Sequence, residues 1–180
     1  MNSKIVFLII GNFLAGVAIS AQVELVGPLT REQILAGLPE WNNVVEAYSP
    51  DLDTVGRLQA IHEEVEIEVF LGTWCPDSRQ HVSAFFKVMD VVHNDLIRAT
   101  YIGIPRAREG RSKYIAGKNI ERVPTFIIHF RNQEAGRIIE TPHLSVEGDL
   151  LEILQKKSAA ARRSEDYLSR PITSREMTSR

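Results

Sequence analysis

The sequence predicts an α/β fold in which a central mixed β-sheet is flanked by helices and preceded by an N-terminal helical extension. Segments with the two-residue period of strands alternate with segments of helical period, in the order strand, helix, strand, β-hairpin and closing helix. The length of 180 residues favours one domain with its own core. Of these residues 44% are hydrophobic and 24% are charged, with a net charge of -2, which excludes a wholly disordered chain and a basic nucleic-acid binder.

Residues 1–21 have the pattern of a secretory signal peptide. Lys4 precedes an apolar run over residues 5–19, and small residues follow as far as Ala21. This run is shorter than the roughly 20 apolar residues that a membrane-spanning helix needs. We therefore expect a signal peptide that is removed on export. The alternative is an uncleaved N-terminal anchor, which would associate the protein with a membrane.

The folded domain is assigned to residues 22–157, and its N-terminal part is predicted to be helical. Thr30 and Gln33 form a capping box ahead of apolar residues at helical spacing, and Pro39 is expected to divide this helix in two. A further helix is predicted within residues 49–63.

The strands are predicted from alternation and from short apolar runs. Residues 65–71 begin with strict alternation and end in a continuous apolar run, which is typical of a strand that enters the interior of a sheet. Further strands are expected over residues 96–104, 125–130 and 136–140, with residues 131–135 as the hairpin turn.

Two amphipathic helices are predicted to flank the sheet, one from Ser78 and one that opens at Ser145. Residues 158–180 carry few large apolar side chains, so we expect a disordered tail there.

The connection between the second and third predicted strands, residues 105–122, is basic. This composition fits either a mobile solvated connection or a contact for an anion or an acidic protein. Its basic residues are Arg106, Arg108, Arg111, Lys113, Lys118 and Arg122, against Glu109 and Glu121.

Cys75 is the only cysteine, which excludes an intrachain disulfide, a zinc ribbon based on cysteines and a CxxC pair. It lies on the turn between a predicted strand and a predicted helix. The free amides and the positive dipole end of such a helix stabilise a thiolate. Asp77 opposes this effect and Arg79 can offset that opposition. The alternative is that Cys75 is a small buried apolar residue.

Ser78 stands where the second cysteine of a CxxC pair would stand. Its hydroxyl can donate a hydrogen bond to the sulfur but cannot attack a mixed disulfide, so product release would need a second thiol from elsewhere. Pro124 comes directly before a predicted strand, and taken alone it would be expected in the common trans form.

Together, TWCPDS between a strand and a helix, and VPTF before a later strand, resemble the thioredoxin superfamily. More closely, LGTWCPDSR is similar to a group of bacterial thioredoxin-like proteins whose turn reads WCxDS. The resemblance covers residues 60–156. It implies that Cys75 is the nucleophile, with Ser78 beside it in the catalytic turn, and that Pro124 is cis.

The resemblance also implies a substrate site along the backbone of Val123 and Pro124, since an extended peptide can pair there beside the sulfur. Trp74 and Pro76 are assigned to the rim of this site. Val69 departs from the family, because thioredoxins keep a buried aspartate at that strand position. Together with the serine at position 78, this departure argues against an efficient dithiol reductase.

We therefore expect an exported, periplasmic or otherwise extracytoplasmic, thioredoxin-like protein that performs monothiol thiol–disulfide exchange through Cys75. Its partners would be protein disulfides or small thiols such as glutathione. The alternative is a non-catalytic binding or chaperone-like module that uses the groove beside Pro124. No paired metal spacing, phosphate-binding loop or dinucleotide fingerprint is present, so we expect no metal, cofactor or nucleic acid.

Overall fold

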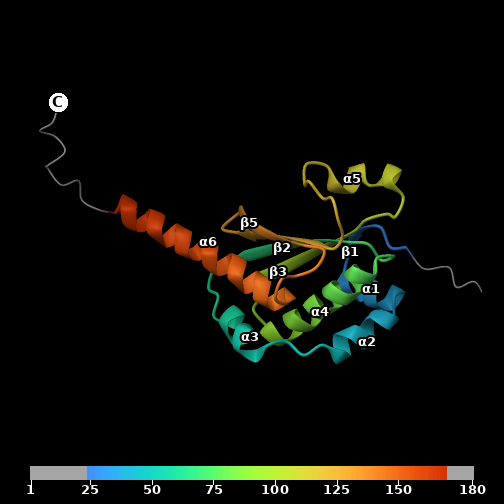
Figure 1. Ribbon diagram of the computed structural model, residues 1–180, viewed down its shortest axis with the longest axis horizontal. Helices are drawn as coiled ribbons and strands as arrows, with labels where there is room; N and C mark the ends of the chain where they lie inside the picture. Colours follow the sequence, from blue (N-terminus) through green and yellow to red (C-terminus); the bar gives the residue numbers. More distant parts are fainter. Residues whose placement is uncertain (1–23, 170–180) are drawn as a thin grey trace, which may run out of the picture.

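The computed structural model describes residues 24–169, so the signal peptide predicted for residues 1–21 lies outside the described residues (Figure 1). Over residues 24–169, no helix is both long enough and apolar enough to cross a membrane.

The centre of the fold is a mixed sheet of five strands in the order β1-β3-β2-β4-β5. The strands are β1 (Gly27–Leu29), β2 (Val65–Leu71), β3 (Ile97–Gly103), β4 (Thr125–Phe130) and β5 (Gln133–Ile139). β2 runs parallel to β3 and antiparallel to β4, while β1 and β5 are antiparallel edge strands. The mixed sheet that the sequence predicts is therefore confirmed.

The two edges of the sheet differ from the sequence prediction. β1 was not predicted, because a strand of three residues is too short to show a period. Its Gly27 pairs with Gly103 of β3. A Cβ atom at Gly103 would stand 2.3 Å from the carbonyl oxygen of Leu25. At the other edge, β5 begins at Gln133 rather than at residue 136. Arg131 and Asn132 have φ values of 51° and 60°, so they form a tight two-residue hairpin turn with the twist that hairpins favour.

Three short helices form the N-terminal extension: α1 (Arg31–Gly37), α2 (Glu40–Ala47) and α3 (Leu52–Gln59). The capping box is present, and Pro39 separates α1 from α2 as predicted. α3 is capped by the side chain of Asp51, whose carboxylate accepts a hydrogen bond from the Thr54 amide at 2.8 Å.

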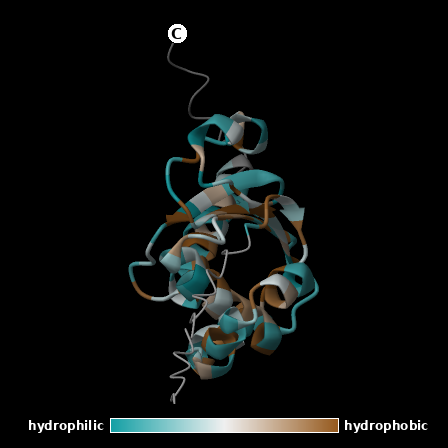
Figure 2. Ribbon diagram, turned by 90° about the vertical axis from the view of Figure 1, so that its right-hand side faces the viewer, coloured by the Kyte–Doolittle hydropathy of each residue, from teal (hydrophilic) through white to brown (hydrophobic). Residues whose placement is uncertain are grey.

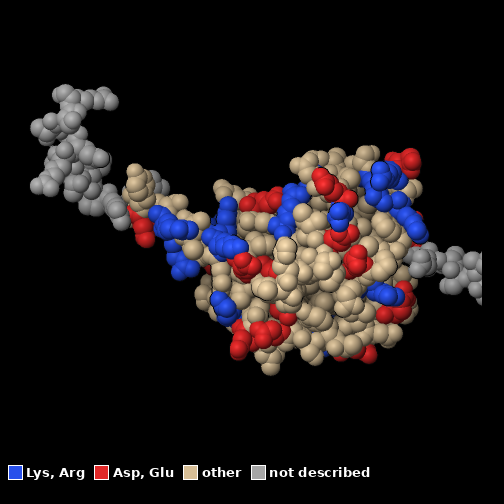
Figure 3. Space-filling model, viewed as in Figure 1, with Lys and Arg blue, Asp and Glu red and all other residues tan. Residues whose placement is uncertain are grey.

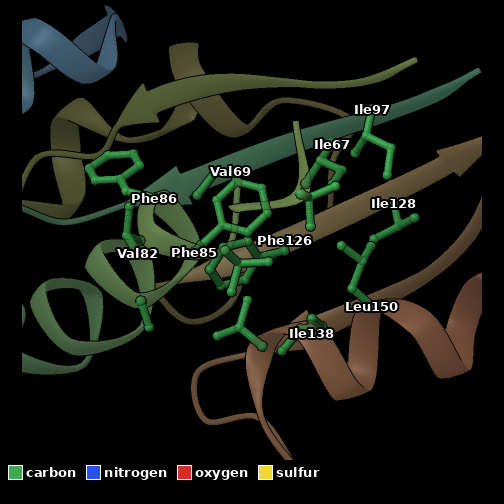
Figure 4. Packing of buried hydrophobic residues seen from close by; sticks show 14 of the residues in the cluster. Ile67, Val69, Val82, Phe85, Phe86, Ile97, Phe126, Ile128, Ile138 and Leu150 are labelled. Carbon is green, nitrogen blue, oxygen red and sulfur yellow. The ribbon is translucent and has the colours of Figure 1, made fainter. Parts of the chain in front are cut away.

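α4 (Pro76–Val92) and α6 (Val146–Leu168) cover one face of the sheet, and the N-terminal helices lie on the same side (Figure 1). Their apolar faces interleave with the sheet (Figure 4), and the rings of Phe85 and Phe126 meet edge to face at 5.4 Å. We call this cluster the main core. Its large and fully buried side chains are Ile34, Trp41, Leu58, Ile67, Leu71, Phe85, Phe86, Phe126 and Ile128.

The opposite face of the sheet is covered by the connection between β3 and β4, which contains a 3-10 turn, η1 (Arg108–Gly110), and α5 (Ser112–Ile115). Figures 1 and 2 show this connection as a separate layer above the strands. Beneath it lies a second, smaller apolar cluster, which we call the site cluster. Its buried members are Phe70, Cys75, Ile104, Val123 and Ile127, and the half-buried Trp74, Ile102, Tyr114, Ile115 and Ile120 pack against them.

α6 is longer than expected. The prediction of a disordered tail is wrong over residues 158–168, because the helix continues without a break to Leu168. The run Ala159–Arg163 consists of strong helix formers. In addition, Arg131 in the hairpin turn binds Glu165 at 2.8 Å, which ties the projecting part of α6 to the sheet.

Candidate functional site

Cys75 lies at the junction of β2 and α4, as the sequence predicts. It is the N-cap of α4, with extended backbone, and Pro76 takes the first helical position, where its missing amide costs no hydrogen bond. The turn is closed by two backbone hydrogen bonds: the Cys75 amide donates to Gly72 at 2.9 Å, and the Arg79 amide donates to Cys75 at 3.1 Å. The thiol therefore stands at the positive end of a 17-residue helix.

The sulfur lies against the loop that precedes β4. Cys75 Sγ donates a hydrogen bond to the carbonyl oxygen of Val123 at 3.3 Å, although the two residues are 48 positions apart. The peptide bond between Val123 and Pro124 is cis. Both Cys75 and Val123 are 9% exposed. The proton of the thiol is therefore engaged by the proline loop, and little of the surface of Cys75 meets solvent.

A pocket of about 210 Å³ opens beside the sulfur. Cys75 and Val123 form part of its wall. Its remaining residues are Trp74, Ile104, Arg111, Ile115, Ile120, Glu121, Arg122 and Glu140. The pocket is therefore apolar around the sulfur and charged where the connection and the end of β5 border it.

A smaller hollow, of about 70 Å³, lies on the other side of the turn. Cys75 and Trp74 contribute to it, as do Pro76 and Arg79 of α4 and Glu40 of α2. Pro76 is exposed here, so the structure places it beside this hollow rather than in the main pocket.

Trp74 forms the wall between the two hollows and is held from three directions. Its indole Nε1 donates to the carbonyl oxygen of Ile104 at 2.9 Å. The Arg111 guanidinium lies over its ring at 5.4 Å. A Cβ atom at Gly72 would come within 2.8 Å of the indole, so only glycine leaves room for it. The rim residue predicted from the sequence is thus a fixed wall.

Ser78 is fully buried, and its hydroxyl oxygen accepts a hydrogen bond from the Gly72 amide at 3.1 Å. The hydroxyl therefore supports the backbone of the turn, while the hydrogen bond of the sulfur goes to Val123. Val69 is fully buried in the main core, with no acid at that strand position.

The basic connection contributes more to the site than the sequence indicates. Ile115 and Ile120 pack onto the site cluster, and Lys118 pairs with Glu68 of β2 at 2.7 Å. The connection is therefore anchored on the sheet through these residues. That the connection covers the site cluster was not predicted from the sequence. The available signal was the large apolar residues among its charged ones, because a solvated linker seldom carries such residues.

Glu140 was also missed. It follows β5, its amide donates to the Pro124 carbonyl at 2.7 Å, and its carboxylate pairs with Arg122 at the edge of the pocket. The hydrogen bond that the Arg122 guanidinium donates to this carboxylate raises the pKa of Arg122 above its usual value. This pair closes one side of the pocket with opposite charges.

The architecture is thioredoxin-like: a mixed sheet with a cysteine turn at the start of a helix and a cis proline before the next strand of the sheet. A family model described as Thioredoxin matches residues 35–147, more than half of the chain, and the protein belongs to the thioredoxin family.

Two solved structures are similar. A protein of unknown function from Pseudomonas aeruginosa is 19% identical with a TM-score of 0.56, over 73% of this chain and 93% of that chain. An HIV epitope-scaffold is 21% identical with a TM-score of 0.52, over 68% of this chain and 89% of that chain. At these identities the likeness shows the fold alone. Comparison with curated proteins finds no match.

Proposed function

We propose that the protein performs monothiol thiol–disulfide exchange through Cys75, as the resemblance to thioredoxin-like proteins with a WCxDS turn implies. One observation carries this proposal: Cys75 is the N-cap residue of α4, and its sulfur lies 3.3 Å from the carbonyl oxygen of Val123 beside an open pocket. A substrate that enters the pocket meets the sulfur and the backbone of the proline loop together.

The exchange proceeds in two balanced steps. The Cys75 thiolate attacks one sulfur of a substrate disulfide, a new S–S bond forms, and the other substrate sulfur leaves as a thiolate that takes up a proton. A second thiol, from the substrate or from a small thiol such as glutathione, then attacks the substrate sulfur. This second attack releases the Cys75 thiolate and leaves the disulfide on the substrate and the incoming thiol.

Substrate binding and the hydrogen bond of the sulfur are linked through Val123. In the resting protein the Val123 carbonyl accepts from the thiol. An extended substrate that pairs with Val123 takes this acceptor, as strand addition does. The thiol then gives up its hydrogen bond to Val123, which leaves the sulfur available to the bound substrate.

Trapping of mixed disulfides tests the proposal. Because Ser78 cannot release a bound substrate, adducts with wild-type protein should accumulate on non-reducing gels of the native envelope fraction and disappear with reductant. The Cys75→Ser variant should form none. Absence of adducts that depend on Cys75, together with slow alkylation of the thiol by iodoacetamide below pH 7, would refute the exchange activity.

A second candidate is a non-catalytic binding or chaperone-like module that uses the same groove. Two observations favour it: Cys75 is only 9% exposed with the proton of its thiol engaged, and an aliphatic residue, Val69, replaces the buried acid. Here the Cys75→Ala variant should retain partner binding unchanged, whereas a mixed-disulfide mechanism predicts loss of covalent capture.

Export of the mature chain is part of the proposal, and the apolar pattern of residues 5–19 supports it. Cell fractionation and the intact mass of the protein test it. A mature N-terminus near residue 22 in the periplasmic fraction is expected. A full-length chain in the membrane fraction would instead support the anchor, and a full-length chain in the cytoplasm would contradict export.

A further inference from the structure

The charges around the pocket beside Cys75 are not distributed evenly. At one side Arg122 is neutralised by its pair with Glu140, and Glu121 adds a further negative charge. At the Trp74 side the charged residue of the wall is Arg111, which is half-buried. Figure 3 shows Lys and Arg side chains gathered on the surface over the end of the connection that holds this residue.

Arg111 is held in place without losing its charge. Its Nε donates to the Pro105 carbonyl at 2.9 Å and one terminal nitrogen donates to the Arg106 carbonyl at 2.7 Å. Its guanidinium also lies over the ring of Trp74. Among residues 24–169, no carboxylate forms an ion pair with it. These contacts orient the group but do not neutralise it, so a full positive charge faces the pocket.

We propose that Arg111 selects substrates that carry an aspartate or glutamate beside the reacting cysteine, so that the natural partner is an acidic polypeptide segment. The remaining guanidinium N–H groups would bind the carboxylate along the Trp74 wall. Ile115 and Ile120 would contact the apolar part of the segment, and Val123 its backbone. This inference rests on the proposed function for its chemistry, but the binding preference can be measured without it.

Equilibrium binding is the first test, in the Cys75→Ser background so that no covalent bond can form. Three peptides of seven residues, identical except for Asp, Asn or Lys on both sides of a central serine, are titrated by calorimetry. The Asp peptide should bind about fivefold more tightly than the Asn peptide, as expected for one partly exposed charge pair, and the Lys peptide more weakly. High salt should reduce these differences.

Substitutions then assign the preference to its residue. Arg111→Gln should bring the Asp and Asn peptides within twofold of each other, and Arg111→Glu should favour the Lys peptide. Arg111→Lys keeps the charge and should keep the order of affinities. Arg108→Gln is the matched control, because Arg108 lies in the same connection but outside the pocket wall. Circular dichroism of each variant verifies that the fold is intact.

Three results would overturn the inference: equal affinity for the Asp and Asn peptides, loss of the preference in Arg108→Gln as complete as in Arg111→Gln, or no binding of any peptide at millimolar concentration. The same peptides with a central cysteine, activated as the thiopyridyl disulfide, separate this failure from failure of the proposed function. If the Asp and Asn peptides react with wild type at equal rates, exchange is supported and the acidic preference is rejected. A preference in binding without any reaction supports Arg111 and rejects exchange.

Discussion

The main core and the site cluster lie on opposite faces of the same sheet and differ in how they are closed. The main core is enclosed by long helices, and its largest side chains are fully buried. The site cluster is closed only by half-buried residues of the connection, such as Ile115 and Ile120, and by Trp74. Large buried side chains are thus concentrated on one face, while Cys75 lies under the thinner layer, beside the pocket.

The largest expected effect comes from the main core. Phe85→Ala should lower the free energy of unfolding by about 3–5 kcal/mol, because it leaves a cavity among well-packed side chains. Ile120→Ala in the site cluster should cost only about 1 kcal/mol, since its side chain is half-exposed. Chemical denaturation measures both.

The alkylation rate of the Cys75 thiol should respond to these two variants in the reverse order, with the larger change in Ile120→Ala. Under native conditions Ile120→Ala should speed alkylation of Cys75 by opening its cover, whereas Phe85→Ala should leave the rate near that of wild type. If Ile120→Ala proves as destabilising as Phe85→Ala, the two clusters are one cooperative core and the comparison fails.

Two serines of α4 provide a finer test of how the turn is held, since both are fully buried. Ser78→Ala leaves the buried Gly72 amide without its acceptor and should cost about 1–3 kcal/mol. The hydroxyl of Ser83 has no hydrogen-bond partner among the described residues, so Ser83→Ala should be neutral or stabilising. The denaturant midpoints of the two variants measure both effects. A larger loss of stability in Ser83→Ala than in Ser78→Ala would contradict this account of the turn.

Gly72 tests how tightly the wall of the pocket is fixed. Gly72→Ala places a methyl group 2.8 Å from the indole of Trp74 and should cost about 1–2 kcal/mol while it shifts the tryptophan fluorescence. Gly56→Ala is the matched control in α3: it meets nothing within 4 Å and should stabilise by about 0.5–1 kcal/mol. An unchanged free energy of unfolding in Gly72→Ala would show that Trp74 is free to move.

The smallest expected effect is the pH dependence of α4 through His81. Burial lowers the pKa of His81 below its usual 6.5, and nearby Asp77 opposes this only in part. The unfolded chain therefore binds more protons as the pH falls through 6.5, and the free energy of unfolding decreases from pH 7 to pH 5.5. His81→Gln should weaken this decrease by a few tenths of a kcal/mol, about the size of a partly exposed charge effect. If the free energy of unfolding of His81→Gln decreases between pH 7 and pH 5.5 by as much as that of wild type, His81 is not the source of the decrease.

Elements whose formation depends on neighbouring residues could be predicted from the sequence. The capping box at Thr30, the break at Pro39 and the start of α4 after Cys75 all follow from hydrogen bonds and steric limits within a few positions. The same is true of β2 and β4, whose alternation or apolar runs identify them. The candidate nucleophile was therefore found from the sequence, with its helix.

The surroundings of that sulfur depend on the tertiary structure. It joined β1 to the end of β3, folded the basic connection over the site cluster, and brought Val123 and Arg111 to the pocket of Cys75. These contacts join positions tens of residues apart, and no local period or cap encodes them. They arise because the sheet must bury both of its faces, so the packing of the whole chain selects which distant side chains meet.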